Sequence, residues 1–298
     1  MLEIWFLYAL TSVVFFGFTT IVDKLMLENR FSSFSYFITF APPALVFSIW
    51  VFAFQRTVLS LPYAFAFVAG LISAGGYFLY VVSIRAEEAS RVAALTSLYP
   101  AFVAVLAVFL VNEIFPAGSY LGIILMILGT ILISYKRNHV RKIVPLSLVI
   151  VLIATNFCYS LDQILSKISL DHISFWPFLM MFMLGRFFVV FPSLALSSVR
   201  RKFISEIERL ERKFALLLVL GSSMWSIALI FYFYAASLGP ITLVSTTALI
   251  SPLFTLLFAI LITKYLPKVL EEEIDGRTVA MKLVAIVLIC VGTYLIMT

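Results

Sequence analysis

The chain has 298 residues, of which 63% are hydrophobic and only 12% are charged. Its mean hydropathy of +1.13 exceeds what a water-soluble domain of this length needs to fill its core. A bilayer core about 30 Å thick requires about 20 apolar residues for each spanning helix, and lipid offers no partners to unpaired backbone groups. The apolar runs are unbroken and lack sustained alternation with polar residues, so we expect an all-α integral membrane protein.

Ten apolar runs follow one another along the chain, separated by short connections. The first run begins almost at Met1 without a basic leading segment, so we expect a retained helix and not a cleaved signal. Ten transmembrane helices would place both termini on the same side of the membrane. The predicted spans are residues 3–22, 34–54, 62–84, 92–111, 118–135, 144–166, 174–198, 214–237, 241–263 and 278–297.

The basic residues are distributed unevenly over the connections. The odd-numbered connections hold 17 of the 21 Lys and Arg residues, whereas the even-numbered ones hold only Arg56 and Lys167. The positive-inside rule therefore places the odd connections in the cytoplasm and both termini outside. The stretch from Arg200 to Lys213 is expected to meet anionic lipids at the bilayer surface. We expect the plasma or inner membrane of the cell, with no nucleic-acid partner.

The second half of the chain repeats the first. A shift of 152 residues superposes Tyr80 on Tyr232 without a gap, and the motif Leu-Gly-Thr-Ile-Leu-Ile from residue 128 aligns with Val-Gly-Thr-Tyr-Leu-Ile from residue 291. Chance similarity between apolar helices is the alternative explanation. Because five spans separate the copies, we expect two inverted five-helix repeats, the architecture of transporters whose site lies between two halves. The expected repeats are residues 1–142 and 143–298.

Several motifs occur in a fixed order along both halves. In the second half, a helix that ends with Tyr232-Phe-Tyr-Ala-Ala-Ser-Leu is followed by a Gly239-Pro240 turn and then by Pro252. Taken together, these motifs and those of the first half resemble the EamA-type ten-helix members of the drug/metabolite transporter superfamily over essentially the whole chain. The first half shows the family's proline, glutamate and glycine spacing at Pro100, Glu113, Gly122 and Gly129.

The resemblance implies a central pathway enclosed by the first, third, fourth, sixth, eighth and ninth helices. Family members usually keep both termini in the cytoplasm, contrary to the orientation that the basic residues indicate, so both orientations stay open. The chain departs from the family pattern at Arg85–Arg91, where a short apolar turn is usual, and at Lys264-Tyr265, where a glutamate is expected.

Polar residues within the spans are the candidates for substrate binding, because transport needs a water-accessible cavity. In the sixth span, Asn156, Tyr159 and Gln163 recur at intervals of three and four and form one polar face, for which hydrogen bonding between helices is the alternative. A lining rich in aromatic residues suits a small amphipathic or aromatic metabolite. The candidates are Thr19, Tyr77, Tyr80, Thr96, Tyr99, Asn156, Tyr159, Gln163, Ser226, Tyr234, Ser245 and Thr246.

Two ionisable residues within the spans are candidates for coupling or charge recognition. Asp162 can exchange a proton for substrate, although its expected position near the interface also fits a structural role. Arg186 lies near the middle of its span, where a charge costs about 2.5–3.5 kcal/mol and requires a partner. That partner is either a carboxylate or helix-end carbonyls of the protein, or an anionic group of the substrate.

Two prolines occupy equivalent positions in the middle of predicted spans. Pro100 and Pro252 each remove a backbone N–H and are expected to kink their helices. The kinks are candidate hinges for gating, and static bends that widen the cavity are the alternative.

These features favour a secondary transporter that exports or exchanges a small organic metabolite, such as an amino acid or an amphipathic compound, by alternating access. A nucleotide-sugar or phosphorylated-metabolite exchanger is the closest alternative, and a non-transporting scaffold or receptor is the alternative of another class. The chain has no Walker phosphate loop, and Cys158 and Cys290 lie within apolar runs, so we expect no cofactor and no metal site. We expect no enzyme activity, because the two histidines, His139 and His172, lie near loops.

Overall fold

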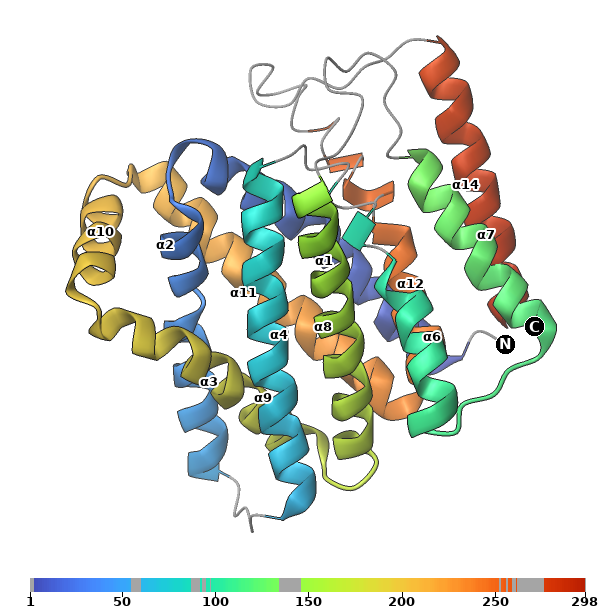
Figure 1. Ribbon diagram of the computed structural model, residues 1–298, viewed down its shortest axis with the longest axis horizontal. Helices are drawn as coiled ribbons and strands as arrows, with labels where there is room; N and C mark the ends of the chain where they lie inside the picture. The colour runs from blue at the N-terminus through green and yellow to red at the C-terminus, as the bar shows by residue number, and fades with distance from the viewer. Residues whose placement is uncertain are drawn as a thin grey trace.

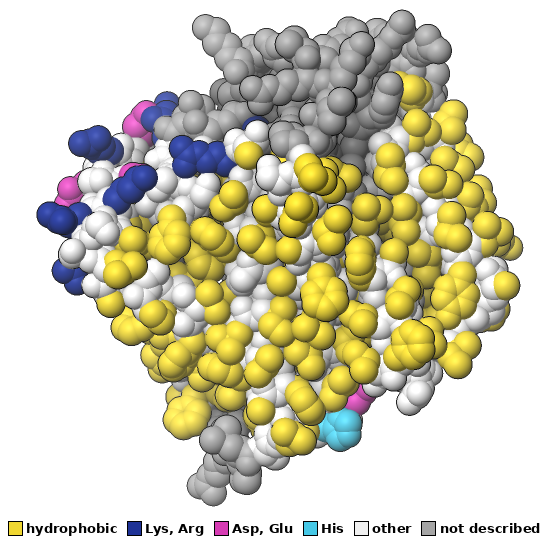
Figure 2. All heavy atoms as spheres, in the orientation of Figure 1, with side chains coloured by type: hydrophobic (Ala, Val, Ile, Leu, Met, Phe, Trp, Pro, Cys, Tyr) yellow, Lys and Arg dark blue, Asp and Glu magenta, His cyan; other side chains and the backbone are white. Residues whose placement is uncertain are grey.

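The described part of the structure, a computed structural model, consists of helices joined by turns and short connections (Figure 1). The described residues are 3–54, 60–86, 92, 95–96, 98–133, 146–251, 253–255, 257–258, 261 and 276–297. Large apolar side chains are exposed over most of the outer surface, where they form the broad hydrophobic belt in Figure 2. A surface of this kind is typical of a membrane protein, so the predicted all-α membrane fold is confirmed, although the division into ten helices and two inverted repeats is not.

Six helices in the described part of the chain are long and apolar enough to cross a membrane, and further apolar helices occupy the other predicted spans. Two of the six spans are composite, because α2 joins α3 and α9 continues into a 3₁₀ turn. The six spanning helices are α1 (Ile4–Asn29), α2 (Ser33–Ile38) with α3 (Ala41–Phe54), α4 (Leu61–Ala86), α8 (Leu146–Leu170), α9 (Phe175–Val190) with η1 (Phe191–Ala195), and α11 (Arg212–Leu238). The others are α6 (Tyr99–Leu110), α7 (Ala117–Ile133), α12 (Ile241–Thr247) with η2 (Ala248–Ile250), and α14 (Gly276–Met297).

Prolines interrupt two predicted spans that the sequence analysis treated as continuous. The run 34–54 breaks between α2 and α3, because Pro42 and Pro43 lie in the first turn of α3. The run 174–198 leaves α-helical geometry after Val190, next to Pro192. Proline has no backbone N–H and therefore cannot donate a hydrogen bond within a helix. The connection that follows is not an irregular loop, because it contains a further helix, α10 (Ser197–Glu208).

The expected kink at Pro100 is replaced by a helix start. Helix α6 begins at Tyr99 after a turn at Leu98, so Pro100 lies in its first turn and not in the middle of a span. The first turn of a helix has no intrahelical acceptor for its N–H groups, so proline is accommodated there without loss of a hydrogen bond. Pro252, the second expected hinge, lies outside the described residues.

Glycines allow the closest contacts between helices. In α4, a side chain at Gly70 would overlap the carbonyl oxygen of Phe182 in α9, and one at Gly185 in α9 would overlap that of Phe67 in α4. The two backbones therefore touch through reciprocal glycines, the small-residue contact that packs helices in membranes.

The contact between α7 and α14 is also reciprocal. A Cβ at Gly129 would lie 2.8 Å from the carbonyl oxygen of Ala285, and one at Gly292 would lie 2.6 Å from that of Gly122. The alignment that superposes Gly129 on Gly292 also superposes Gly122 on Ala285. Each helix thus presents the same surface to the other.

Two charged side chains hold the turn between α11 and α12. The ammonium of Lys167 donates to carbonyl oxygens at the end of α11, including that of Gly239 at 3.3 Å. The carboxylate of Glu113 accepts from the backbone N–H groups of Ile241 (2.7 Å) and Thr242 (2.9 Å), at the start of α12. Opposite charges therefore pair with the opposite dipoles of the two helix ends.

We predict that Gly70→Ala lowers the free energy of unfolding by about 1–3 kcal/mol, because the added methyl group meets backbone atoms. Gly75→Ala in the same helix is the control, since a Cβ there meets nothing within 4 Å. Thermal unfolding in detergent measures both variants. Equal melting temperatures for the two would contradict this account of the α4–α9 contact.

We predict that Glu113→Gln destabilises the protein by about 1–3 kcal/mol, because an amide has one acceptor oxygen for two backbone donors. Glu208→Gln, at an exposed carboxylate of α10, is the charge-matched control and should melt like the wild type. Thermal unfolding in detergent measures the stability of both variants. A Glu113→Gln protein as stable as the control would exclude the role of Glu113 in capping α12.

Candidate functional site

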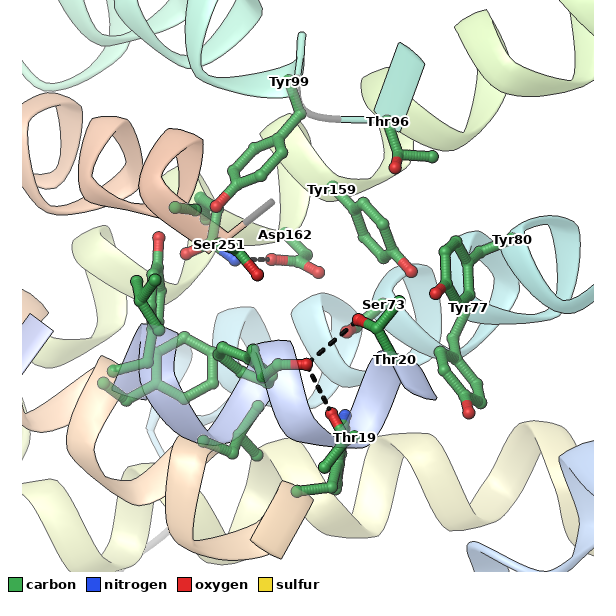
Figure 3. A pocket seen from close by; sticks show the side chains of 18 of the residues that line it. Thr19, Thr20, Ser73, Tyr77, Tyr80, Thr96, Tyr99, Tyr159, Asp162 and Ser251 are labelled. Atoms are coloured by element: carbon green, nitrogen blue, oxygen red, sulfur yellow. Dashed lines mark hydrogen bonds between the residues drawn. The ribbon is translucent and has the colours of Figure 1, made fainter. Parts of the chain in front are cut away.

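A cavity of about 210 Å³, here called the central cavity, lies among helices that come from both halves of the chain (Figure 3). Helices α1, α4, α8, α9 and α11 supply most of its wall, and the segment after α12 completes it. The lining residues are Val13, Phe16, Thr19, Thr20, Asp23, Ser73, Tyr77, Tyr80, Thr96, Tyr99, Tyr159, Asp162, Gln163, Phe182, Arg186, Trp225, Leu229, Tyr232, Phe233, Ala248, Ser251 and Thr255.

Aromatic rings form much of the cavity wall, accounting for nine of the 22 lining residues. Figure 3 shows Tyr99 and Tyr159 converging on the space around Asp162. Phe182 and Phe233 stack edge to face, with ring centroids 4.7 Å apart, and close part of the wall with buried rings. The cavity thus offers flat apolar surfaces and a few polar groups, the usual composition of a site for a small organic ligand.

Arg186 is buried in the cavity wall, with 5% of its surface exposed. One guanidinium nitrogen donates a 2.8 Å hydrogen bond to the Ser73 hydroxyl, and the group lies 4.5 Å from the ring centroid of Trp225 and 5.6 Å from that of Tyr77. In the described part of the chain its direct contacts are thus a hydroxyl and two ring faces, and not the carboxylate or helix-end carbonyls that one of the two alternatives for Arg186 required. A guanidinium has five N–H donors, and this arrangement leaves several for a ligand.

Asp162 faces the same space as Arg186. Its carboxylate accepts a 2.6 Å hydrogen bond from the side-chain amide of Gln163 and is within hydrogen-bonding range of the Ser73 hydroxyl. Ser73 therefore lies between the guanidinium and the carboxylate. Asp162 is 1% exposed, so its carboxylate lies within the protein and not at an exposed edge.

Asp23 is a second carboxylate in the wall, and the sequence analysis did not select it as a site residue. It accepts a 2.7 Å hydrogen bond from the hydroxyl of Tyr36 and is 6% exposed. It lies four residues after Thr19 on the same face of α1, a spacing that was visible in the sequence. The described wall thus holds two carboxylates, Asp23 and Asp162, and one guanidinium, Arg186.

Three buried polar atoms of the wall make no hydrogen bond of normal length and angle. They are the hydroxyls of Tyr77 and Tyr232 and the amide oxygen of Gln163. An unsatisfied buried polar group costs about 1–3 kcal/mol, so such groups are rare in proteins unless water or a ligand pairs with them. Two of them keep a polar neighbour in the protein, since the Tyr77 hydroxyl interacts with Asp23 and the Tyr232 hydroxyl with Tyr99.

The structure brings most of the predicted site residues together. The residues that line the central cavity are Thr19, Tyr77, Tyr80, Thr96, Tyr99, Tyr159, Asp162, Gln163 and Arg186. Their role in substrate binding stays a prediction. Trp225 and Tyr232 were not selected, although the superposition of Tyr80 on Tyr232 pointed to Tyr232.

Two predicted lining residues serve helix packing instead. The amide nitrogen of Asn156 donates to the carbonyl oxygens of Leu95 and Leu152, each at 2.8 Å, so it joins α8 to the chain before α6. Ser226 donates to the carbonyl of Ser222 in its own helix and faces a smaller hollow beside α3. The bond from Asn156 to Leu95 is the hydrogen bonding between helices that was the alternative to a cavity role for this face of α8.

Three others point away from the central cavity. Ser245 and Thr246 are fully buried, and both donate to the carbonyl of Thr242, at 2.9 and 2.6 Å. Tyr234 is exposed at the outer surface, where its ring packs edge to face against Tyr8 with centroids 4.8 Å apart. Helical spacing identifies the polar positions of a helix but not the neighbour that each one faces.

Comparison with known proteins agrees with this fold. Residues 3–135 match the model of the EamA-like transporter family. A solved crystal structure is similar over 95% of this chain and 96% of its own length, with a TM-score of 0.68 and 16% sequence identity, which supports the shared fold. No curated protein matches the chain by sequence.

The match to an EamA-like transporter domain thus covers residues 3–135, and the apolar helices make the chain a multi-pass membrane protein.

We predict that Tyr77→Phe leaves the free energy of unfolding nearly unchanged, because the lost hydroxyl makes no hydrogen bond of normal length and angle. Tyr36→Phe is the matched control and should destabilise the protein by about 1–3 kcal/mol, because it removes the 2.7 Å hydrogen bond to the Asp23 carboxylate. Thermal unfolding of both variants decides. A Tyr77→Phe loss as large as that of Tyr36→Phe would mean that the Tyr77 hydroxyl has a structural partner.

Proposed function

We propose that the protein is a secondary transporter that carries a small organic metabolite through the central cavity by alternating access. The observation that carries the proposal is an amphipathic cavity whose wall combines nine aromatic side chains with three charged ones, Asp23, Asp162 and Arg186. A purely structural scaffold would seal such a cavity with apolar side chains, since each buried charged group opposes folding. We place the protein in the plasma or inner membrane of the cell.

We further infer that residues 1–142 and 143–298 are two inverted five-helix repeats. The reciprocal contact between Gly129 and Gly292, with its matched partners, supports a two-fold relation between α7 and α14. The main helix contacts follow the same relation, because α1 packs along α11 as its counterpart α8 packs along α4. Transporters built from inverted repeats bind substrate at the interface of the two halves, which is where the central cavity lies.

A difference between the halves supports alternating access. Gly70 allows the backbones of α4 and α9 to touch. The residue equivalent to Gly70 after a shift of 152 residues is Ser222 in α11. Ser222 lines a small hollow of about 30 Å³ between α11, α9 and the Pro43 region of α3. One helix pair is thus tightly joined while its counterpart is open, the asymmetry expected of a protein in one of two alternative states.

The charges of the cavity favour an amphipathic substrate with an amino group over a polyanion. Asp162 and the free amide oxygen of Gln163 are acceptors for an ammonium group, while Arg186 is a donor for a carboxylate. Aromatic rings such as Trp225 provide surface for an apolar body. A nucleotide sugar or a phosphorylated metabolite would bring two or more negative charges toward two carboxylates and one guanidinium, which opposes binding.

We predict that a substrate found by thermal-shift screening of amino acids and amphipathic amines is transported in proteoliposomes. Flux through Arg186→Gln should fall about 10- to 100-fold, because a charge-assisted hydrogen bond contributes about 1.5–3 kcal/mol. Tyr234→Phe, outside the cavity, is the control and should retain wild-type flux. Wild-type flux in a folded Arg186→Gln protein would exclude a role for the guanidinium in transport.

We predict that flux depends on pH and that Asp162→Asn removes this dependence, because an amide cannot exchange a proton during the cycle. The measurement is flux at two pH values for wild type, Asp162→Asn and the Tyr234→Phe control. Flux that is independent of pH, or a pH dependence that persists in Asp162→Asn, would remove proton coupling through this residue.

A further inference from the structure

Helix α10 lies at the edge of the helix bundle, next to α2 (Figure 1). One face of it packs inward, where Val199, Phe203 and Leu210 contact a buried apolar cluster. No residue of α10 is fully buried, in contrast to the membrane-spanning helices around it. The helix therefore rests on the bundle and leaves most of its circumference free.

Two acidic residues near α10, Glu206 and Glu211, are engaged in contacts within the protein, whereas Glu208 at the end of α10 is exposed. The Glu206 carboxylate accepts a 3.1 Å hydrogen bond from the backbone N–H of Ser32. Glu211 pairs with Arg30 at 3.2 Å and with Lys213 at 2.8 Å. The hydrogen bond from Lys213 lowers the pKa of the Glu211 carboxyl, so Glu211 stays ionised and holds these two cations.

The basic residues of α10, Arg200, Arg201 and Lys202, are exposed, and so is Arg209 directly after the helix. In the described part of the chain no carboxylate lies within 4 Å of Arg201, Lys202 or Arg209. Figure 2 shows Lys and Arg side chains gathered where α10 lies, directly beside the hydrophobic belt. The positive surface and the apolar belt thus meet along this helix.

Apolar side chains are exposed on the flank of α10 next to that belt. Leu196, Ile204 and Ile207 are 59%, 46% and 39% exposed. Spacings of three and eight residues bring Leu196, Ile204 and Ile207 to one side of a helix with 3.6 residues per turn. A helix with one apolar flank and one basic flank has the form of helices that lie in the plane of a membrane surface.

We infer that α10 is an interfacial helix that binds the headgroups of anionic phospholipids through Arg201, Lys202 and Arg209 while its apolar flank enters the acyl region. This lipid site is separate from the central cavity and independent of the proposed transport. Charge complementarity selects anionic over zwitterionic headgroups, because each basic residue near a negative surface strengthens binding.

The test is native mass spectrometry of the full chain in detergent, titrated with dioleoyl-phosphatidylglycerol or with dioleoyl-phosphatidylcholine. The wild type should bind phosphatidylglycerol more tightly than phosphatidylcholine. The variant R201Q/K202Q/R209Q should lose this preference, with affinity for phosphatidylglycerol falling about fivefold for each cation removed. Thermal unfolding confirms that the variant is folded, as expected for substitutions at exposed positions.

The matched control is R201K/R209K, which changes side-chain shape and keeps every charge. It should bind phosphatidylglycerol like the wild type. Equal affinity of the wild type for the two lipids, or unchanged affinity in R201Q/K202Q/R209Q, would overturn the inference. A loss in R201K/R209K as large as in R201Q/K202Q/R209Q would also overturn it, since charge would not be the determinant.

Discussion

The requirement that polar groups within a membrane find partners inside the protein organises this structure. Most serine and threonine hydroxyls of the spans meet it locally, as Thr155 does by donating to the carbonyl of Val151 at 2.9 Å. The helices can therefore contain many polar residues and still pack in lipid. Larger polar groups have more donors and acceptors than their own helix supplies, and several of them, including Arg186, Asp162 and Gln163, collect at the central cavity.

The same requirement explains how the wall of the cavity is positioned. The turn between α11 and α12 exposes backbone groups at two helix ends, and Lys167 and Glu113 satisfy them. These contacts fix the start of α12, and the segment after α12 contributes Ser251 to the cavity wall. Glu113, which caps the start of α12, thus helps to position the cavity-wall residues that follow α12.

The membrane-spanning helices could be predicted from the sequence, because a helix that crosses lipid must be long and mainly apolar. Apolar runs located the spans, and the spacing of Tyr159, Asp162 and Gln163 identified the cavity face of α8. Contacts between helices were less predictable. Asn156 shares the polar character of α8 but bonds a neighbouring backbone, and the role of Pro100 depends on where its helix begins, which hydropathy does not report.

The central claim is that a wet polar cavity lies between the two halves, and cysteine accessibility tests it most directly. In a Cys158→Ala/Cys290→Ala protein reconstituted in vesicles, Thr20→Cys places a thiol in the cavity wall and Val105→Cys places one on the lipid-facing surface. We predict that a membrane-impermeant charged thiol reagent modifies Thr20→Cys much faster than Val105→Cys, and that added substrate slows this reaction. Equal, slow modification at both positions would contradict a solvated cavity.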